Sequence, residues 1–294
     1  MEVRMVRINI QYNIFIIMTV VWSWADLGDH VLEKHNVKQY WLILSVLSVR
    51  KFNPEWRRVF VVDKETYDFI NSKNLISLWD EVKIIDFKNT EYGNLYNLKL
   101  YAWPKIYSYG VVDDDILILD IDIVFKQKFI IPDKNKVCGQ FYNFSQSFYL
   151  SDEKEHDIKN NFKFVKYCQY FLKSIGIEFK ELSDSDTCIT GSPVYIPKGL
   201  GSIFQKEILN NFYKLENIDN PFYQLNLFEV RWVLEEEYPI AYLGEQYGGI
   251  CCIDKDIYFH IFTSNFNYSI IEGVSTIEDI LEIPVFEEYI KYKI

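Results

Sequence analysis

The chain has 294 residues, which is enough for one large α/β domain or a core with a small additional lobe. Its formal net charge of −11 argues against a nucleic-acid backbone or an anionic membrane as the main partner. Hydrophobic residues make up 49% of the chain, as in ordinary globular proteins, and most of the aromatic residues (17%) are expected in the core.

The N-terminus and the cysteines bear on the cellular compartment. The apolar run at residues 14 to 22 follows Arg4 and Arg7, as in a secretory signal, but it is too short to span a bilayer. We therefore expect a buried first strand and no transmembrane span. Five cysteines without a zinc spacing, one pair of them adjacent, favour a reducing cytoplasm over a disulfide framework. A cytoplasmic location, with peripheral association at the inner face of the membrane left open, is the expectation.

The first half of the chain alternates strand and helix patterns, which predicts an α/β fold with a mostly parallel sheet covered by helices. Aspartates 113 to 115 are expected in a solvated turn, and Pro104 should kink or restart its helix. The predicted strands are residues 14 to 21, 58 to 62, 82 to 87 and 116 to 120. The predicted helices are residues 40 to 52, 64 to 73 and 94 to 110.

After residue 126 the alternation loosens. We expect helices at residues 162 to 176 and 224 to 237, and a late strand at 257 to 262. The segment 188 to 197 is interpreted as a strand broken by Gly191 and Pro193. Because the chain shows no internal repeat and no low-complexity linker, a single domain is preferred.

The run ILILDIDIVF, residues 116 to 125, is the most informative segment, because a buried strand there leads directly into Asp120 and Asp122. Ligands of open α/β sheets bind beyond the carboxyl ends of the strands. Alternate side chains of an extended chain share a face, so both carboxylates can reach one ion. Two hard oxygen ligands suit Mg²⁺ or Mn²⁺, the usual companions of a diphosphate. The alternative is a structural turn.

The order of these segments resembles the nucleotide-sugar glycosyltransferases of the GT-A fold, most nearly the family 8 type and related bacterial surface-polysaccharide enzymes. The resemblance covers roughly residues 14 to 262. The matching segments are VVWSWADLG (20 to 28), VFVVDKET (59 to 66), LKLYAWPKIY (98 to 107), ILILDID (116 to 122), CITGSPVYI (188 to 196) and IYFHIF (257 to 262). It implies one GT-A domain over 1–294, with a nucleotide-binding half (14–126), a smaller acceptor-side half (127–262) and a C-terminal extension (263–294).

The resemblance implies a metal site made of Asp120, Asp122 and His260. The metal would bridge the diphosphate of the donor, and the imidazole favours Mn²⁺ over Mg²⁺. A histidine packed beside Phe259 and Phe262 is the alternative. This chain lacks the glycine and lysine that the family places beyond its histidine, so a different group must meet the phosphates.

Further residues take roles from the same resemblance on the donor side. Lys99, ahead of Lys105, is the candidate for the basic residue that faces the donor, and a solvated lysine is the alternative. Asp63 matches a residue that faces the base or ribose. Trp22 would stack on the base and Ser23 would form a hydrogen bond, although a core role for Trp22 is equally compatible with the sequence.

Around the transferred sugar, Gly191 would let backbone approach the donor, with the hydroxyls of Thr190 and Ser192 beside it. Glu229 matches the family's acidic residue near both sugars, where it would orient the acceptor or stabilise positive charge. An exposed carboxylate paired with a nearby base is the alternative. Glu245 and Gln246, interpreted as part of a glycine-bounded loop, are a weaker choice for the same cleft.

The expected function is transfer of a sugar from a nucleotide-diphosphate donor, with UDP preferred, to a glycan or other hydroxyl acceptor with retention of configuration. Two alternatives stay open. One is a haloacid dehalogenase-like phosphatase with Asp120 as its nucleophile, but such enzymes carry the motif on their first strand. The other is a non-catalytic module that binds a sugar or nucleotide.

Overall fold

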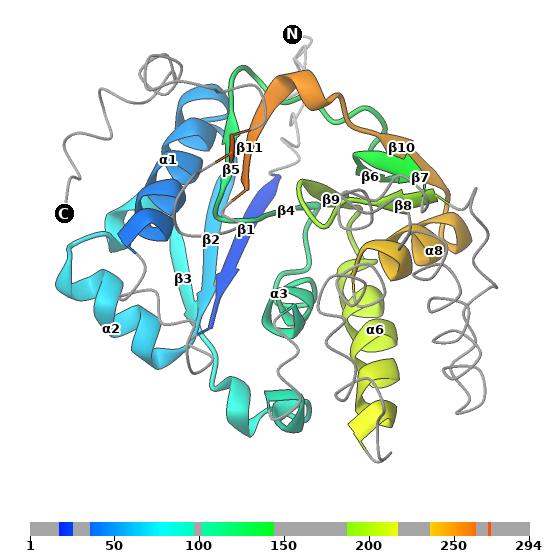
Figure 1. Cartoon of the computed structure of the whole chain (residues 1–294), viewed down its shortest axis with the longest axis horizontal. Coiled ribbons are helices and arrows are strands. Elements are labelled where there is room, and N and C mark those ends of the chain that lie inside the picture. Colours follow the sequence, from blue (N-terminus) through cyan, green and yellow to red (C-terminus); the bar gives the residue numbers. More distant parts are fainter. Residues whose placement is uncertain are drawn as a thin grey trace, which may run out of the picture.

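The computed structural model describes residues 18–25, 36–96, 102–143, 187–216, 236–262 and 270–271 (Figure 1). The helices are α1 (Asn36–Phe52), α2 (Lys64–Ser72), α3 (Trp103–Ser108), α6 (Gly201–Glu216) and α8 (Tyr238–Gln246). The strands are β1 (Thr19–Trp24), β2 (Arg57–Val62), β3 (Glu81–Ile84), β4 (Ile116–Leu119), β5 (Ile123–Phe125), β6 (Val137–Gly139), β7 (Phe141–Asn143), β8 (Thr187–Ile189), β9 (Val194–Ile196), β10 (Ile250–Cys252), β11 (Tyr258–Phe262) and β12 (Ile270–Ile271).

The centre of the fold is a seven-stranded sheet of order β10-β6-β9-β4-β1-β2-β3. Only β9 runs antiparallel to its neighbours among these described strands, which confirms the predicted α/β fold with a mostly parallel sheet. The chain proceeds from β1 to β2 and β3 on one side, and β4 then pairs with the opposite side of β1. The strand order therefore reverses between β1 and β4, which is where open α/β sheets bind their ligands.

Helices α1 and α2 lie on one side of the sheet, and α3, α6 and α8 lie on the other (Figure 1). Alternating side chains of the strands are buried against both layers. Val20 and Trp22 belong to a core with α1 and α2, whereas Val21 belongs to a core with α3, α6 and α8. Because both faces are covered, the central strands are apolar throughout, and β4 is buried at every position. This apolar continuity explains why the polar residues that follow β4 were conspicuous in the sequence.

Element boundaries differ from the prediction where polar side chains compete with the strand. β1 ends at Trp24, and residues 14 to 17 of the predicted strand lie outside the described residues. β3 ends at Ile84, after which Asp86 caps a 3₁₀ turn, so the predicted strand to residue 87 is too long. Pro104 lies in the first turn of α3 and therefore begins a helix, as predicted.

Two predicted segments are not described: residues 162 to 176 and most of the helix at 224 to 237. Among the helices that are described, none is both long and apolar enough to cross a membrane.

The aspartates before β4 tie the sheet to its surroundings. Asp114 accepts hydrogen bonds from Thr19 (2.9 Å) and Arg57 (3.1 Å), and Asp115 accepts from the Tyr195 hydroxyl (3.1 Å). They lie in the predicted turn, but they are bonded to side chains of β1, β2 and β9 rather than simply solvated.

Polar residues at the end of α1 and directly after it fix the position of β5, the strand that follows Asp122. The backbone amide of Phe125 donates to the hydroxyl of Ser48 at 3.0 Å. Asn53 is fully buried, and its amide group bonds both the N–H and the carbonyl of Phe129, each at 3.1 Å. These contacts hold the segment after the D-x-D pair against α1.

We expect Asn53→Ala to lower the free energy of unfolding by about 2–4 kcal/mol, because it leaves the buried N–H and carbonyl of Phe129 unpaired. Urea unfolding followed by circular dichroism measures the change. Asn71→Ala, at an exposed position of α2, is the matched control and should change stability by less than about 0.5 kcal/mol. Equal effects of the two substitutions would contradict the role given to Asn53.

Candidate functional site

The D-x-D pair lies on a tight turn directly after β4. β4 ends at Leu119, and the amide of Ile123 donates to the carbonyl of Asp120 at 3.3 Å. The amide of Asp120 donates to the hydroxyl of Ser192 at 2.7 Å. The prediction of an extended chain through both aspartates is thus wrong in detail: the turn brings the two carboxylates together.

His260 reaches this turn through strand pairing. β11 runs antiparallel to β5, with His260 opposite Ile123, the residue after Asp122. The Nε2 atom of His260 lies 3.7 Å from Oδ1 of Asp122, and the potential ligand atoms of Asp120, Asp122 and His260 all lie within 4.8 Å of one another. The structure therefore brings together the three residues that the sequence nominated as metal ligands.

The donor set fits a divalent cation. Oδ1 of Asp122 is enclosed and has no hydrogen-bond partner among the described residues, although the side chain as a whole is 17% exposed. The 3.7 Å separation from His260 is too long for a hydrogen bond. Two ligands that each lie about 2.1 Å from one ion are roughly 3–4 Å apart, which is the spacing observed here. A buried carboxylate oxygen without a partner is costly unless a cation completes its environment.

A buried ionic network adjoins the group of Asp120, Asp122 and His260 on the face of the sheet where α3 packs. Lys105 of α3 lies 2.7 Å from Oδ1 of Asp120 and 2.9 Å from Oε1 of Glu236, just before α8. The hydroxyl of Tyr109 donates to the same Glu236 oxygen at 2.6 Å. Lys105 thus links the D-x-D turn to a second acidic residue that is 4% exposed.

Gly191 leaves the space that this network occupies. A Cβ atom at this position would lie 2.6 Å from Oε2 of Glu236 and 3.1 Å from Nζ of Lys105. The glycine is required by the close approach of the Lys105–Glu236 pair. The approach of a donor sugar to Gly191 stays a prediction. The hydroxyl of Thr190 donates to the carbonyl of Ser192 at 3.4 Å, within the same turn.

The ionisation of these groups follows from burial and mutual repulsion. Burial, reinforced by the charge of Asp120, raises the pKa of Asp122 to about 8. Burial also raises the pKa of Glu236, while Lys105 opposes the rise. The pKa of Lys105 is raised, because attraction to Asp120 and Glu236 outweighs its desolvation. Without a cation, Asp122 therefore holds a proton below about pH 8.

Other predicted site residues lie elsewhere. Trp22 is fully buried, and its indole N–H donates to the hydroxyl of Ser45, so the predicted stacking on a base has no room; Trp22 is a core residue. Asp63 caps α2 by accepting from the amide of Thr66 at 2.9 Å, which gives it a structural role. Ser23 lies partly buried near the end of β1. Lys99 and Glu229 lie outside the described residues.

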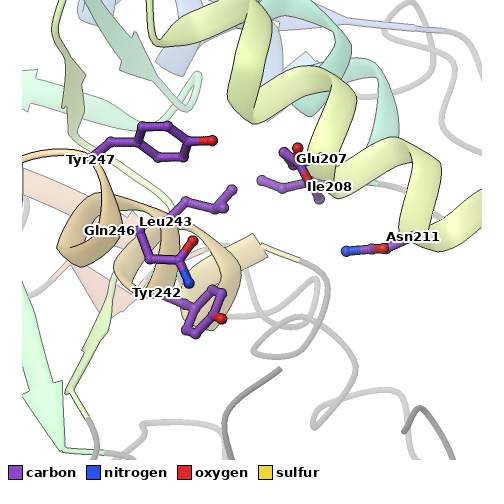
Figure 2. Close-up of a pocket in the computed structure, with 7 residues that line it drawn as sticks. All are labelled: Glu207, Ile208, Asn211, Tyr242, Leu243, Gln246 and Tyr247. Atoms are coloured by element: carbon purple, nitrogen blue, oxygen red, sulfur yellow. The ribbon is translucent and has the colours of Figure 1, made fainter. Parts of the chain in front are cut away.

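Glu245 and Gln246 are not on a loop, because α8 continues through Gln246. They end a nine-residue helix, about 13 Å from its start near Glu236. Gln246 instead lines a cavity of about 250 Å³ between α6 and α8 (Figure 2). The residues around this cavity are Glu207, Ile208, Asn211, Tyr242, Leu243, Gln246 and Tyr247.

Sequence reasoning missed Glu236 and Tyr109. Glu236 stands within three consecutive glutamates, a pattern that normally marks an exposed surface. Tyr109 could have been found, because it follows Lys105 by four residues and so shares a helical face with it. Lys105, the second of the two lysine candidates, contacts Asp120, and Lys99 lies outside the described residues.

No model of a known protein family matches the sequence, and no curated protein sequence matches it significantly. Several solved structures match at low identity. The galactosyltransferase LgtC, in complex with donor and acceptor sugar analogs, is 14% identical with a TM-score of 0.37, over 81% of this chain and 73% of that one. The glycosyltransferase GlyE of Streptococcus pneumoniae TIGR4 is 9% identical with a TM-score of 0.43, over 95% of this chain and 60% of that one. Mouse xyloside xylosyltransferase 1 is 10% identical with a TM-score of 0.41, over 81% of this chain and 85% of that one.

The raised pKa of Asp122 predicts an effect on stability. A carboxyl with a folded-state pKa above its unfolded value stabilises the fold when protonated, and this contribution is lost as the pH rises towards about 8. In metal-free protein we therefore expect Asp122→Asn to raise the Tm at about pH 9 and to do so less at about pH 6. Each 1 kcal/mol corresponds to roughly 2–4 °C in a domain of 150–250 residues.

Thermal scans with a chelator measure this difference, and Asp113→Asn, at an exposed aspartate of the turn before β4, is the matched control. Added Mn²⁺ should raise the Tm of the wild type and the control but not that of Asp122→Asn. A pH-independent difference between Asp122→Asn and wild type would show that Asp122 is not the titrating group.

Proposed function

We propose that the chain is a metal-dependent glycosyltransferase of the GT-A type that moves a sugar from a nucleoside-diphosphate donor, preferably a UDP-sugar, to a hydroxyl of a glycan acceptor. The observation that carries the proposal is the unpartnered oxygen of Asp122. It lies with Asp120 and His260 beyond the carboxyl ends of β1 and β4, beside a buried lysine–glutamate pair. Carboxylates and a histidine in this position suit a divalent cation and the diphosphate it accompanies.

Asp120, Asp122 and His260 would hold the cation, with Mn²⁺ favoured by the imidazole. When bound, a divalent cation offsets the negative charge that develops on a departing diphosphate. Lys105 bonds only one oxygen of Asp120 and thereby fixes the orientation of this carboxylate. The hydroxyl of Ser192, just before β9, accepts a hydrogen bond from the amide of Asp120 and thereby fixes the turn.

Glu236 takes the role that the sequence assigned to Glu229. Its carboxylate is held by Lys105 and Tyr109 and occupies the space that the missing side chain of Gly191 leaves. A fixed carboxylate beside the transferred sugar would stabilise positive charge at the anomeric carbon or orient the acceptor hydroxyl. Since the anchoring groups are buried, this charge needs little reorganisation as the sugar is transferred.

A cytoplasmic location, which rests on the cysteine usage of the sequence, belongs to the same proposal. Retention of configuration and the family 8 type also belong to it, and they rest on the order of motifs in the sequence. So does the division of one domain into a nucleotide-binding half and an acceptor-side half. The described structure adds that strands from both halves share one sheet, with β9, β6 and β10 continuing beyond β4.

Metal-dependent nucleotide binding tests the proposal directly. We expect calorimetry to show UDP binding that is at least about tenfold tighter with Mn²⁺ than with a chelator, and Asp122→Ala to abolish the difference. A panel of nucleotide sugars should show slow Mn²⁺-dependent donor hydrolysis. Absence of UDP and GDP binding, combined with hydrolysis of a generic phosphomonoester, would establish the phosphatase alternative. Metal-independent sugar binding would indicate a binding module.

The assignment of Glu236 predicts that Glu236→Gln lowers kcat by about 10²–10³-fold with little change in the KM for the donor, because a charge aimed at the reacting centre is removed. Glu65→Gln, at an exposed position of α2, should leave kcat unchanged. Steady-state kinetics with the best donor of the panel, together with the Tm of each variant, provides the measurement. A larger loss of kcat in Glu229→Gln than in Glu236→Gln would return the role to Glu229.

A further inference from the structure

Lys38 is a basic residue near the candidate metal site that the motif comparison did not single out. It lies in the first turn of α1, and its Nζ atom is 5.2 Å from the centre of the Trp24 ring, at the end of β1. The side chain is partly buried. Among the described residues, no carboxylate lies within ion-pair distance of its ammonium group.

Register places Lys38 at the level of the D-x-D turn. In the pairing of β1 with β4, Trp22 is opposite Leu119, so β1 extends two residues further and Trp24 is level with the turn. Burial lowers the pKa of Lys38, and the attraction of Asp122 opposes this change; Lys38 in turn lowers the pKa of Asp122. The ammonium group therefore acts on the metal site without bonding to it.

Lys38 and Lys105 differ in their surroundings. Lys105 approaches from the core that contains α3 and is held at 2.7 Å and 2.9 Å by two carboxylates. Lys38 approaches from the opposite face of the sheet, where α1 packs. An aromatic ring positions its ammonium group but does not neutralise it. Lys38 is thus available to a ligand, whereas Lys105 is engaged by the protein.

The charge of the site indicates what such a ligand would be. When all are ionised, three carboxylates (Asp120, Asp122, Glu236) and two lysines (Lys38, Lys105) leave a single negative charge. A divalent cation would reverse that sign. An ammonium group beside a cation site weakens cation binding, so its placement is favourable only when an anion joins the cation.

We propose that Lys38 binds the diphosphate of the donor, meeting the phosphate oxygens from α1 while Lys105 stays between its two carboxylates. This inference rests on the proposed function and deepens it, because it supplies the basic group that the segment after His260 lacks. It also assigns Lys38 a second effect, repulsion of the cation in the absence of nucleotide.

The two effects have opposite signs and can be measured separately by calorimetry on Lys38→Met. With UDP and saturating Mn²⁺, we expect affinity for UDP to fall about tenfold or more, because a charge-assisted hydrogen bond is lost. With Mn²⁺ alone, we expect affinity for the cation to rise a few-fold, because a nearby positive charge is removed. Affinity for uridine, which has no phosphate, should be unchanged.

Lys64→Met is the matched control. Lys64 is exposed on α2 and pairs with Asp68, so all three affinities should equal those of the wild type. Lys38→Arg keeps the charge and should retain most of the UDP affinity. Lys38→Gln replaces Lys38→Met should the latter have a lowered Tm.

The outcomes distinguish the two levels of the proposal. If the wild type binds UDP with Mn²⁺ and Lys38→Met binds it equally well, the role of Lys38 is overturned and the proposed function stands. A loss of Mn²⁺ affinity in Lys38→Met without nucleotide also overturns the role, since it would mean that Lys38 merely supports the metal ligands. If the wild type shows no Mn²⁺-dependent UDP binding, the proposed function fails and the role of Lys38 with it.

Discussion

The central constraint on this structure is the accumulation of acidic side chains at one edge of an otherwise apolar sheet. Asp120, Asp122 and Glu236 lie close together, and neither burial nor proximity favours three negative charges. Lys105 compensates two of them through direct ion pairs. Asp122 is left with an unpartnered oxygen and a raised pKa. The fold tolerates this arrangement because the surrounding packing and hydrogen bonds hold it in place.

The compensation requires segments that are far apart in the sequence. The carboxylates come from the turn after β4 and from the start of α8, and the lysine between them comes from α3. The turn itself is held by a hydrogen bond to Ser192, just before β9, and Gly191 leaves room for the ion pair. On the opposite face, Ser48 of α1 and Asn53, directly after this helix, fix the segment that follows Asp122. A metal site of this kind thus depends on both buried faces of the sheet at once.

Local sequence predicted the parts of this arrangement that depend on neighbouring residues. The apolar run before Asp120 identified a buried strand and the end of that strand, and the pairing of β5 with β11 brings His260 to the position that its motif suggested. Contacts between distant segments carry no local signal. Glu236 looks like an exposed glutamate in its own sequence, and only the packing of α8 against the sheet makes it a partner of Lys105. The prediction that Trp22 stacks on a base was wrong for a related reason, because a core indole and a stacking indole have the same sequence pattern.

Under the proposed function, the electrostatics of the site would make binding of a cation and binding of a diphosphate mutually dependent. Without ligands, a proton on Asp122 relieves the cost of burying its charge and the repulsion from Asp120, and a cation would have to displace this proton. The cation would also be repelled by Lys38 until an anion arrives. A diphosphate alone would meet the carboxylates, which repel it. Each ligand therefore lowers the free energy of binding the other, and linkage requires the two effects to be equal. A site with this charge pattern favours the metal–diphosphate pair over either ion alone, which is the selectivity that a nucleotide-sugar transferase needs.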